Sequence, residues 1–309
     1  MEREPAVISE TATPALNALL RLTAPRPYNY AFLDEGTKRA IRRAILKAVA
    51  IPGYQVPFGS REMPLARGWG TGGLQVTLSV IGPGDTVKVI DQGTDAGVNA
   101  SNIRRLIERT TGLPTTTDTA RATVIQTRHR VPEEPLRPDQ ILVYQVPLPE
   151  PLRMVEPSEA RTRRMHAEAD YSKIWVHLYE DVVRKGDISI ATGYPVLVNE
   201  RHVMSTTPVP RWDVPKMHNA PFLQLFGAGR EKRIYAIPPH TSVRPLDFDD
   251  YPFRVEDFGD AACLRCGSRG VYFDRVLEQR ADGTVVRGFA CSDTAWCDKK
   301  LAAHGEKRP

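Results

Sequence analysis

Residues 263–297 read CLRCGSRGVYFDRVLEQRADGTVVRGFACSDTAWC, and this stretch decides the fold of the last part of the chain. It contains every cysteine of the 309-residue sequence. Two residues separate Cys263 from Cys266, 24 separate Cys266 from Cys291, and five separate Cys291 from Cys297. Four cysteines in so long a chain are too few for a disulfide scaffold, and their clustering predicts a metal site.

A β-hairpin is predicted inside this stretch. β-branched and aromatic residues flank Asp282-Gly283, a pair that is typical of a hairpin turn. A hairpin between residues 271 and 290 carries Cys291 back to the first two cysteines. The spacing therefore predicts a compact, cysteine-rich subdomain at the end of the chain.

The spacing leaves two occupants of this site open. Four thiolates can close a tetrahedron around a structural zinc ion, as in a zinc ribbon. Alternatively, three thiolates can hold an iron–sulfur cluster and leave one cysteine free for chemistry. The unequal gaps, two residues in one pair and five in the other, permit the second arrangement without demonstrating it.

Composition and charge exclude several classes of protein. Apolar residues make up 41% of the chain, and runs such as LQVTLSVI at 74–81 bury enough area to exclude disorder throughout. No apolar run approaches the roughly 18 residues of a membrane span, so we expect a cytoplasmic protein without a membrane partner. The net charge, 42 − 37 = +5, produces only a weak positive electrostatic field. That field suits small phosphorylated ligands as well as a polyanion.

Upstream of the cysteines, the sequence predicts an α+β domain with a mixed, mostly antiparallel sheet and packed helices. A helix is expected at 35–50, because Asp34 is an N-cap residue type and Pro52 stops a helix. The apolar patterns predict the other elements: strands at 74–81, 87–92, 122–130 and 141–149, helices at 99–111 and 158–185, and a hairpin at 188–204.

Some glycines and polar residues of this region are candidate site residues. Gly53 lies in a Pro-Gly turn and GWGTGG (68–73) precedes a predicted strand; both are ordinary loops, although a glycine run can also cradle an anion. Arg128 and His129 end one predicted strand, and Gln145 lies on the next. Because arginine suits phosphate, this group is either a surface strand end or a contact for a substrate phosphate.

Long, colinear stretches between residue 28 and about residue 300 are specific enough to indicate a family. Besides the cysteine pattern, they are YNYAFLDEGTKRAIRRAILKAVAIPGYQVPFGSREMP (28–64), GWGTGG (68–73), IQTRHR (125–130), QVPLPEPLR (145–153) and LQLFGAGREKRIYAIPP (223–239). Together they closely resemble the PhnJ family, the catalytic subunits of the carbon–phosphorus lyase complex.

The resemblance implies a radical S-adenosylmethionine enzyme. It would cleave 5-phospho-α-D-ribose 1-methylphosphonate to α-D-ribose 1,2-cyclic phosphate 5-phosphate and methane. A four-iron four-sulfur cluster would be held by Cys263, Cys266 and Cys291, with S-adenosylmethionine on the open iron. Gly53 would carry a glycyl radical, and Cys297 a thiyl radical that attacks phosphorus. In air-exposed samples zinc is expected to fill the four-cysteine site instead, with Cys297 as a ligand.

The resemblance also implies substrate contacts and partners. Arg128, His129 and Gln145 fall in the matching motifs and are expected to touch the substrate. The family works with sister subunits and an ATPase of the ABC type, and we expect no nucleic-acid partner. An insertion at about 149–205 is the predicted docking surface for the ATPase.

The expected domain organisation has three parts. Residues 1–26 form a flexible extension, 27–259 the catalytic α+β domain with its insertion, and 260–309 the iron–sulfur subdomain and tail. An interpretation from another class competes with all of this: a basic zinc-ribbon module that binds nucleic acid or a protein. It predicts four equivalent cysteine ligands and no role for Gly53.

Overall fold

The fold was analysed in a computed structural model of the chain. His129, the predicted helix at 158–185 and most of the predicted docking insertion lie outside the residues that the structure describes. The described residues are 14–21, 33–53, 56–59, 71–128, 130–146, 193–194, 196–199, 201–203, 209–210, 213–228, 232–245 and 258–305.

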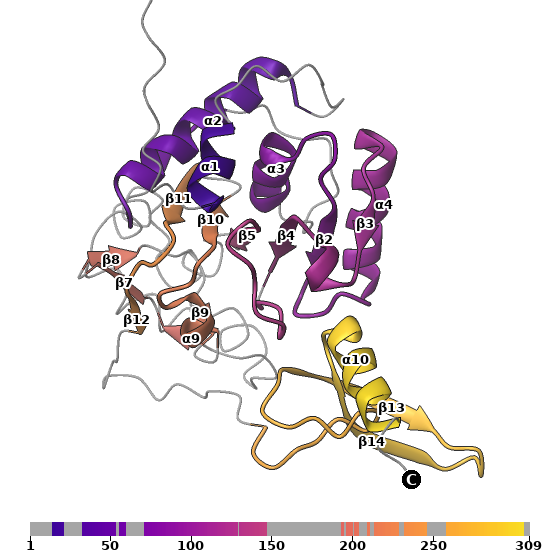
Figure 1. Ribbon diagram of the computed structural model, residues 1–309. Coiled ribbons are helices and arrows are strands. Elements are labelled where there is room, and N and C mark those ends of the chain that lie inside the picture. Colours follow the sequence, from indigo (N-terminus) through magenta and orange to yellow (C-terminus); the bar gives the residue numbers. More distant parts are fainter. Residues whose placement is uncertain are drawn as a thin grey trace, which may run out of the picture.

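A seven-stranded sheet forms the centre of the molecule, in the order β1-β11-β10-β5-β4-β2-β3 (Figure 1). From β10 to β3 every neighbouring pair is parallel, whereas β11 is antiparallel to both β1 and β10. The parallel strands therefore end together along one edge, called the carboxyl edge below. The strands are β1 (Val56–Pro57), β2 (Val87–Ile90), β3 (Thr115–Thr116), β4 (Val124–Thr127), β5 (Ile141–Val146), β10 (Leu223–Ala228) and β11 (Arg233–Ile237).

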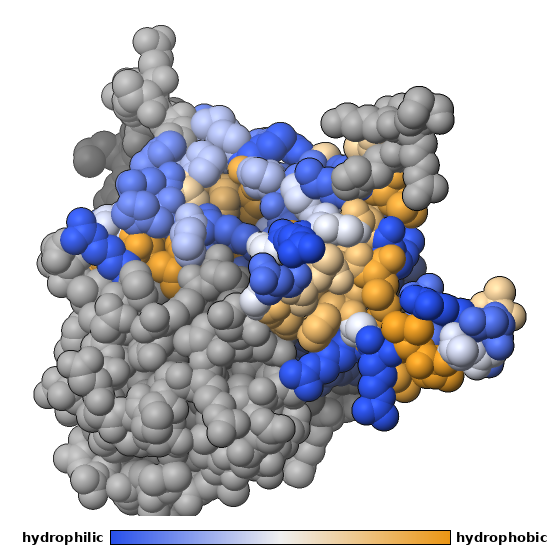
Figure 2. Space-filling view, turned by 90° about the horizontal axis from the view of Figure 1, so that it is seen from below, coloured by the Kyte–Doolittle hydropathy of each residue, from blue (hydrophilic) through white to orange (hydrophobic). Residues whose placement is uncertain are grey.

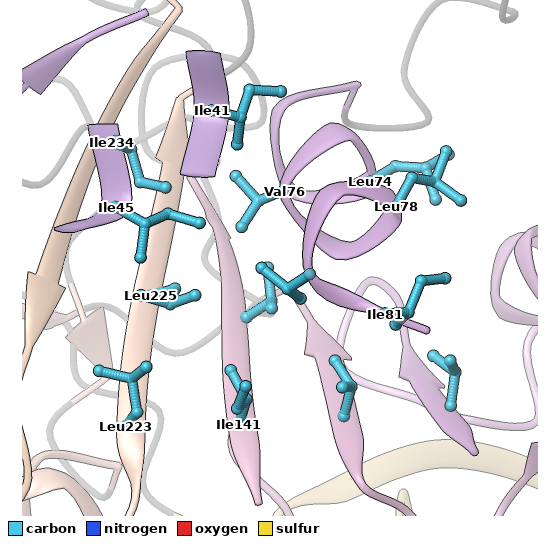
Figure 3. Packing of buried hydrophobic residues seen from close by; sticks show 14 of the residues in the cluster. Ile41, Ile45, Leu74, Val76, Leu78, Ile81, Ile141, Leu223, Leu225 and Ile234 are labelled. Atoms are coloured by element: carbon cyan, nitrogen blue, oxygen red, sulfur yellow. The ribbon is translucent and has the colours of Figure 1, made fainter. Parts of the chain in front are cut away.

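The helix expected after Asp34 is confirmed. Helix α2 spans Glu35–Ala50, and the Asp34 side chain accepts a hydrogen bond from Thr37 N at 2.8 Å, as an N-cap does. The apolar face of α2 is buried against the sheet, where Figure 3 shows Ile41 and Ile45 beside Ile234 of β11. Local capping and periodicity were sufficient to predict this element.

The strand expected at 74–81 is wrong, because Thr71–Val80 form helix α3. All side chains described in this helix are buried, between α2 and the strands β5 and β10. A short, continuously apolar run fits a buried strand and a buried helix equally well. Parallel strands need a covering layer of helices, and in Figure 3 Leu74, Val76 and Leu78 of α3 supply part of it.

One apolar cluster covers the helical face of the sheet. It joins α2 and α3 to α1 (Pro14–Arg21) and α4 (Val98–Thr111). Helix α4 confirms the helix expected at 99–111 and is capped by Gly112, whose φ of 71° is the left-handed conformation of a C-cap glycine. Helix α1 belongs to the predicted amino-terminal extension, and its Ala18 and Leu19 are buried in this cluster.

The opposite face of the sheet carries a second apolar cluster. Its members include Val214 and Met217 of α9 (Val214–Met217) and Val198 of a small sheet. That sheet confirms the hairpin expected near Asn199, because β7 and β8 pair with Val198 opposite Arg201. Outside the central sheet, the other short elements of residues 119–245 are η1 (Thr119–Arg121), β6 (Gly193–Tyr194), β7 (Val196–Val198), β8 (Arg201–Val203), β9 (Val209–Pro210) and β12 (Val243–Pro245).

The last described segment, residues 258–305, is called the cysteine subdomain. It consists of a hairpin, β13 (Phe273–Gln279) with β14 (Val285–Cys291), and helix α10 (Thr294–Gly305). In Figure 1 these yellow elements lie below the sheet. The hairpin is confirmed, but its turn differs from the expected one. The two-residue turn typical of an Asp-Gly pair needs a positive φ at both residues, and here Gly283 has a positive φ but Asp282 does not.

The α+β class, the mixed sheet and the cysteine-rich end are confirmed. Six of the ten strand pairs in the described residues are antiparallel, as expected. The four parallel pairs all lie in the central sheet. No described helix has the length and apolarity that crossing a bilayer requires. The three-part domain division stays a prediction.

Candidate metal centre and carboxyl edge

The four cysteine thiols converge on one point of the cysteine subdomain. Their sulfur atoms all lie within 4.8 Å of one another, and all four residues are buried. Cys263 Sγ is 3.7 Å from Cys297 Sγ, and Cys266 Sγ is 3.5 Å from Cys291 Sγ. The convergence that the spacing predicted is therefore present.

Three local features bring the thiols together. Cys263 and Cys266 sit in a tight turn, in which Gly267 N donates to Cys263 O at 2.9 Å and Gly267 adopts a φ of 71°. The hairpin register places Cys291 opposite Phe273, so β14 returns to the turn. Cys297 then follows in the first turns of α10.

The thiols differ in their protonation. Burial alone raises the pKa of Cys263, but main-chain N–H groups, those of Cys266 and Cys291 foremost, donate to its sulfur and lower that pKa to about 6. Burial raises the pKa of Cys297 to about 12, with the Cys266 and Cys263 thiols adding to the effect. Without a cation the site thus stabilises one thiolate, and a metal ion that draws on all four must displace protons.

The sulfur positions test which group the site fits. Four thiolates on one tetrahedral zinc ion, each about 2.3 Å from the metal, lie about 3.8 Å apart. Two of the observed separations, 3.7 Å between Cys263 and Cys297 and 3.5 Å between Cys266 and Cys291, are close to that value. The same donor set also suits iron and sulfide, but each thiolate of a cluster binds a different iron atom. A cluster on Cys263, Cys266 and Cys291 would place these three thiols farther apart than they lie here.

Two of the predicted substrate contacts lie side by side at the carboxyl edge. Thr127, the last residue of β4, is paired with Tyr144 of β5, so Arg128, which follows β4, comes next to Gln145 of β5. Arg128 is buried and its Nη2 lies 2.7 Å from Asp91 Oδ2. Gln145 is also buried, and its Oε1 has no hydrogen-bond partner in the described part of the chain. An unpaired buried carbonyl is costly, which indicates a missing partner.

Helix α3 begins against this same point of the edge. A Cβ atom at Gly73 would come within 2.5 Å of Gln145 Cβ, and one at Gly227 within 2.9 Å of Gly72 O. Only glycine allows the first turn of α3 to approach β5 and β10 so closely. Residues 71–73 of the predicted glycine cradle therefore open a helix, whose free N–H groups favour an anion at the edge.

Gly53 lies elsewhere. Its φ of 81° confirms the turn predicted after α2. It precedes β1, the outermost strand, which is separated from β5 by β11 and β10, a distance of about 14 Å at the usual strand spacing. The cysteine subdomain contacts the strands beyond β5, through Lys88 of β2. Within this chain, Gly53 is therefore not brought to Cys297.

A buried charge network joins the cysteine subdomain to the carboxyl edge, and sequence reasoning missed it. Lys88 Nζ lies 3.2 Å from Asp95 Oδ2 and 3.1 Å from Asp293 Oδ1, and Arg130 Nη2 lies 3.2 Å from Asp293 Oδ2. Burial alone raises the pKa of Asp293, but Arg130 and Lys88 lower it to about 2. The one signal in the sequence was Lys88 inside the apolar strand VKVI, since a buried lysine needs a partner.

Comparisons with known proteins identify the family of the chain. The family model described as phosphonate metabolism protein PhnJ matches residues 26–303. The chain is 58% identical over 279 residues to alpha-D-ribose 1-methylphosphonate 5-phosphate C-P lyase of Escherichia coli (strain K12), which covers 90% of this chain and 98% of that protein. It is 57% identical over 278 residues to the C-P-lyase of the same description from Rhizobium meliloti (strain 1021), covering 90% and 92%. These matches confirm the resemblance seen in the sequence: the chain belongs to the PhnJ family of phosphonate metabolism proteins.

Proposed function

We propose that this chain is a carbon–phosphorus lyase that cleaves 5-phospho-α-D-ribose 1-methylphosphonate to α-D-ribose 1,2-cyclic phosphate 5-phosphate and methane. The observation that carries the proposal is the convergence of four buried thiols in a subdomain joined to the carboxyl edge, where Arg128 and Gln145 are neighbours. The two relatives named C-P lyase, each covered over more than nine tenths of its length, support the same reaction.

The proposed substrate site consists of Arg128, Gln145 and the first turn of α3. The Arg128 guanidinium can exchange its contact with Asp91 for a phosphate or phosphonate oxygen. Gln145 offers a buried Oε1 acceptor to a ribose hydroxyl. The first turn of α3 supplies N–H groups for a further phosphate oxygen. His129, outside the described residues, stays a predicted contact.

The cysteines hold the cofactor. Cys263, Cys266 and Cys291 would bind a four-iron four-sulfur cluster, which with S-adenosylmethionine supplies one-electron, hydrogen-abstracting chemistry. Zinc would occupy all four thiolates in air-exposed preparations, in the geometry that the sulfur atoms adopt here. Full turnover by a zinc-only preparation would contradict this mechanism.

Two residues of the chain carry the radical steps. Gly53 would give up a Cα hydrogen atom to the hydrogen-abstracting radical that the cofactor supplies, and its Cα radical would be stabilised between an amide nitrogen and a carbonyl. That radical takes the thiol hydrogen of Cys297. The Cys297 thiyl bonds to phosphorus, the P–C bond breaks, and the methyl radical takes a hydrogen atom from Gly53 Cα to become methane, which regenerates the Gly53 radical. The ribose 2-hydroxyl then displaces the sulfur and closes the cyclic phosphate, which returns the Cys297 thiol.

This radical transfer requires partners. Because Gly53 and Cys297 lie apart within this chain, the transfer needs a rearrangement or a residue from a neighbouring subunit. Sister subunits and an ABC-type ATPase remain the proposed partners, with the cytoplasm as the proposed location. Exposed apolar side chains on the cysteine subdomain, where Figure 2 shows orange surface, support such assembly: Leu264, Leu277, Val285 and Leu301.

The docking of the ATPase is assigned to the insertion at about 149–205. Deleting this segment from the full chain is expected to abolish co-purification with the ATPase while leaving the sister subunits bound. Unchanged ATPase binding would contradict the assignment.

A structural zinc-ribbon module remains the second candidate, since two of the sulfur separations, 3.5 and 3.7 Å, are close to those around a single tetrahedral ion. Iron, acid-labile sulfide and zinc in anaerobically reconstituted protein separate the two functions. Iron and sulfide that survive Cys297→Ala but vanish in Cys263→Ala support three cluster ligands and a free thiol. Zinc alone, lost equally in both variants, would make the site a closed structural ribbon.

A further inference from the structure

Asp293 lies between two of the four cysteines. It follows Cys291 by two residues and precedes Cys297 by four, and its side chain is almost fully buried. Its main-chain carbonyl accepts a hydrogen bond from Cys297 N at 2.9 Å, and its Oδ1 accepts one from Trp296 N at 3.2 Å. Asp293 thus caps the helix that carries Cys297 while it stands on the loop that leaves Cys291.

Two cations of the sheet hold this carboxylate. Lys88 of β2 donates to Oδ1 at 3.1 Å, and Arg130, three residues after β4, lies 3.2 Å from Oδ2. The main-chain N of Glu133 also donates to Oδ2, at 3.2 Å. Both cationic side chains are fully buried, so loss of the Asp293 carboxylate would leave two buried positive charges without one of their partners.

The residues on either side of Asp293 are held by the same edge. Arg130 Nη1 donates to Ser292 Oγ at 2.9 Å, and Thr294 N donates to Asp95 Oδ1 at 3.2 Å. The whole link between Cys291 and α10 is therefore fixed by groups that follow β2 and β4. Arg130 also lies two residues beyond Arg128, the proposed substrate contact.

We propose that Asp293 is a positioning residue for the metal centre. Clamped by Lys88 and Arg130, it sets the separation of the Cys291 and Cys297 thiols and holds them at a fixed place on the carboxyl edge. This inference rests on the metal centre of the proposed function. It goes beyond it by assigning the geometry of that centre to a residue that binds no metal.

Cobalt(II) titration of the full-length apo protein under anaerobic conditions tests the assignment, because thiolate-to-cobalt absorption reports the ligand set. In Asp293→Asn we expect the cobalt affinity to fall at least tenfold, and the charge-transfer absorbance per cobalt to fall by about a quarter as one of four thiolates is lost. The matched control is Asp298→Asn. Asp298 adjoins Cys297 but is exposed and pairs with Arg265 on the surface, so its loss should leave both readouts unchanged.

The outcomes separate positioning from simple attachment. If Asp293→Asn lowers the melting temperature but binds cobalt with the parent's affinity and spectrum, Asp293 only attaches the subdomain and the inference is overturned. A parent protein that binds no cobalt would overturn the metal centre as well. Should Asp293→Asn not fold, Ser292→Ala removes the neutral half of the Arg130 contact, and a cobalt affinity within twofold of the parent would then overturn the inference.

Discussion

Gly93 lies directly against the ring of Tyr272, so that a Cβ atom at Gly93 would come within 3.0 Å of Tyr272 Cε1. Gly93 follows β2 and also adopts a φ of 86°. Tyr272 precedes β13, and its main-chain N donates to Glu133 Oε1 at 3.1 Å. The cysteine subdomain thus packs on the carboxyl edge through a contact that a Cβ atom at Gly93 would crowd.

Gly93→Ala should therefore weaken the packing of the cysteine subdomain against the carboxyl edge. Positive φ alone costs an alanine about 1 kcal/mol, and overpacking against the ring adds about 1–3 kcal/mol. Gly84→Ala is the matched control, because Gly84 has a φ of 91° but nothing within 4 Å of an added Cβ. Denaturant unfolding should show the larger loss in Gly93→Ala, with faster hydrogen exchange across residues 258–305. Equal losses in the two variants would show that the Tyr272 contact does not matter.

Gly53→Ala tests the proposed radical residue. Both Gly53 (φ 81°) and Gly112 (φ 71°) hold left-handed turns at helix ends, so alanine at either position should cost about 1 kcal/mol of stability. Only Gly53→Ala should abolish methane formation by the reconstituted complex, measured by gas chromatography. Methane at the Gly112→Ala level would remove Gly53 from the mechanism.

Gln145→Leu should affect stability and catalysis in opposite directions. Removing a buried acceptor without a partner should stabilise the substrate-free protein by about 1 kcal/mol, while KM should rise about tenfold or more through the lost hydrogen bond. Gln224→Leu is the control, since Gln224 Oε1 is likewise unpaired in the described residues but faces the opposite side of the sheet. A KM unchanged by Gln145→Leu would remove this residue from the substrate site.

Asp213→Asn should change how stability depends on pH. Burial raises the pKa of Asp213 to about 6 against the opposing effect of Lys216. Between pH 4 and 6 the folded protein therefore binds more protons than the unfolded chain, and the contribution of Asp213 to stability falls as the pH rises. In urea unfolding, the free energy of unfolding of the variant, taken relative to that of the parent, should rise by up to about 3 kcal/mol from pH 4 to pH 6.

The control for the pH experiment is Asp139→Asn. Asp139 is exposed and pairs with Arg137, and its pKa is lowered, so its own titration lies below this range. Its curve should run parallel to that of the parent between pH 4 and 6. A parallel curve for Asp213→Asn as well would show that Asp213 titrates normally in the folded protein.

Features decided by nearby residues were predictable from the sequence. The α2 helix follows from its Asp34 cap and apolar spacing, and the convergence of the cysteines follows from two short pairs and a hairpin. The family was also recognisable, because long colinear stretches match. Each of these signals lies within a few tens of residues of the element that it specifies.

Features decided by distant residues were not predictable. The run at 74–81 is helical because it covers parallel strands, whose order no local pattern states. Asp293 meets Lys88 across 205 positions of sequence, and nothing beside either residue names the other. Likewise, Arg128 and Gln145 become neighbours only through the register of β4 and β5.

The hairpin between Cys266 and Cys291 also bears on how such sites are recognised and engineered. Since Phe273 is fixed opposite Cys291 and the turn lies at the far end, residues can be added or removed in pairs, one on each strand, without moving a thiol. The number of residues between Cys266 and Cys291, 24 in this chain, can therefore vary. A sequence pattern for this kind of centre should hold the two short gaps constant and let the long one vary in steps of two, and the hairpin tip offers a site for a tag or fluorophore.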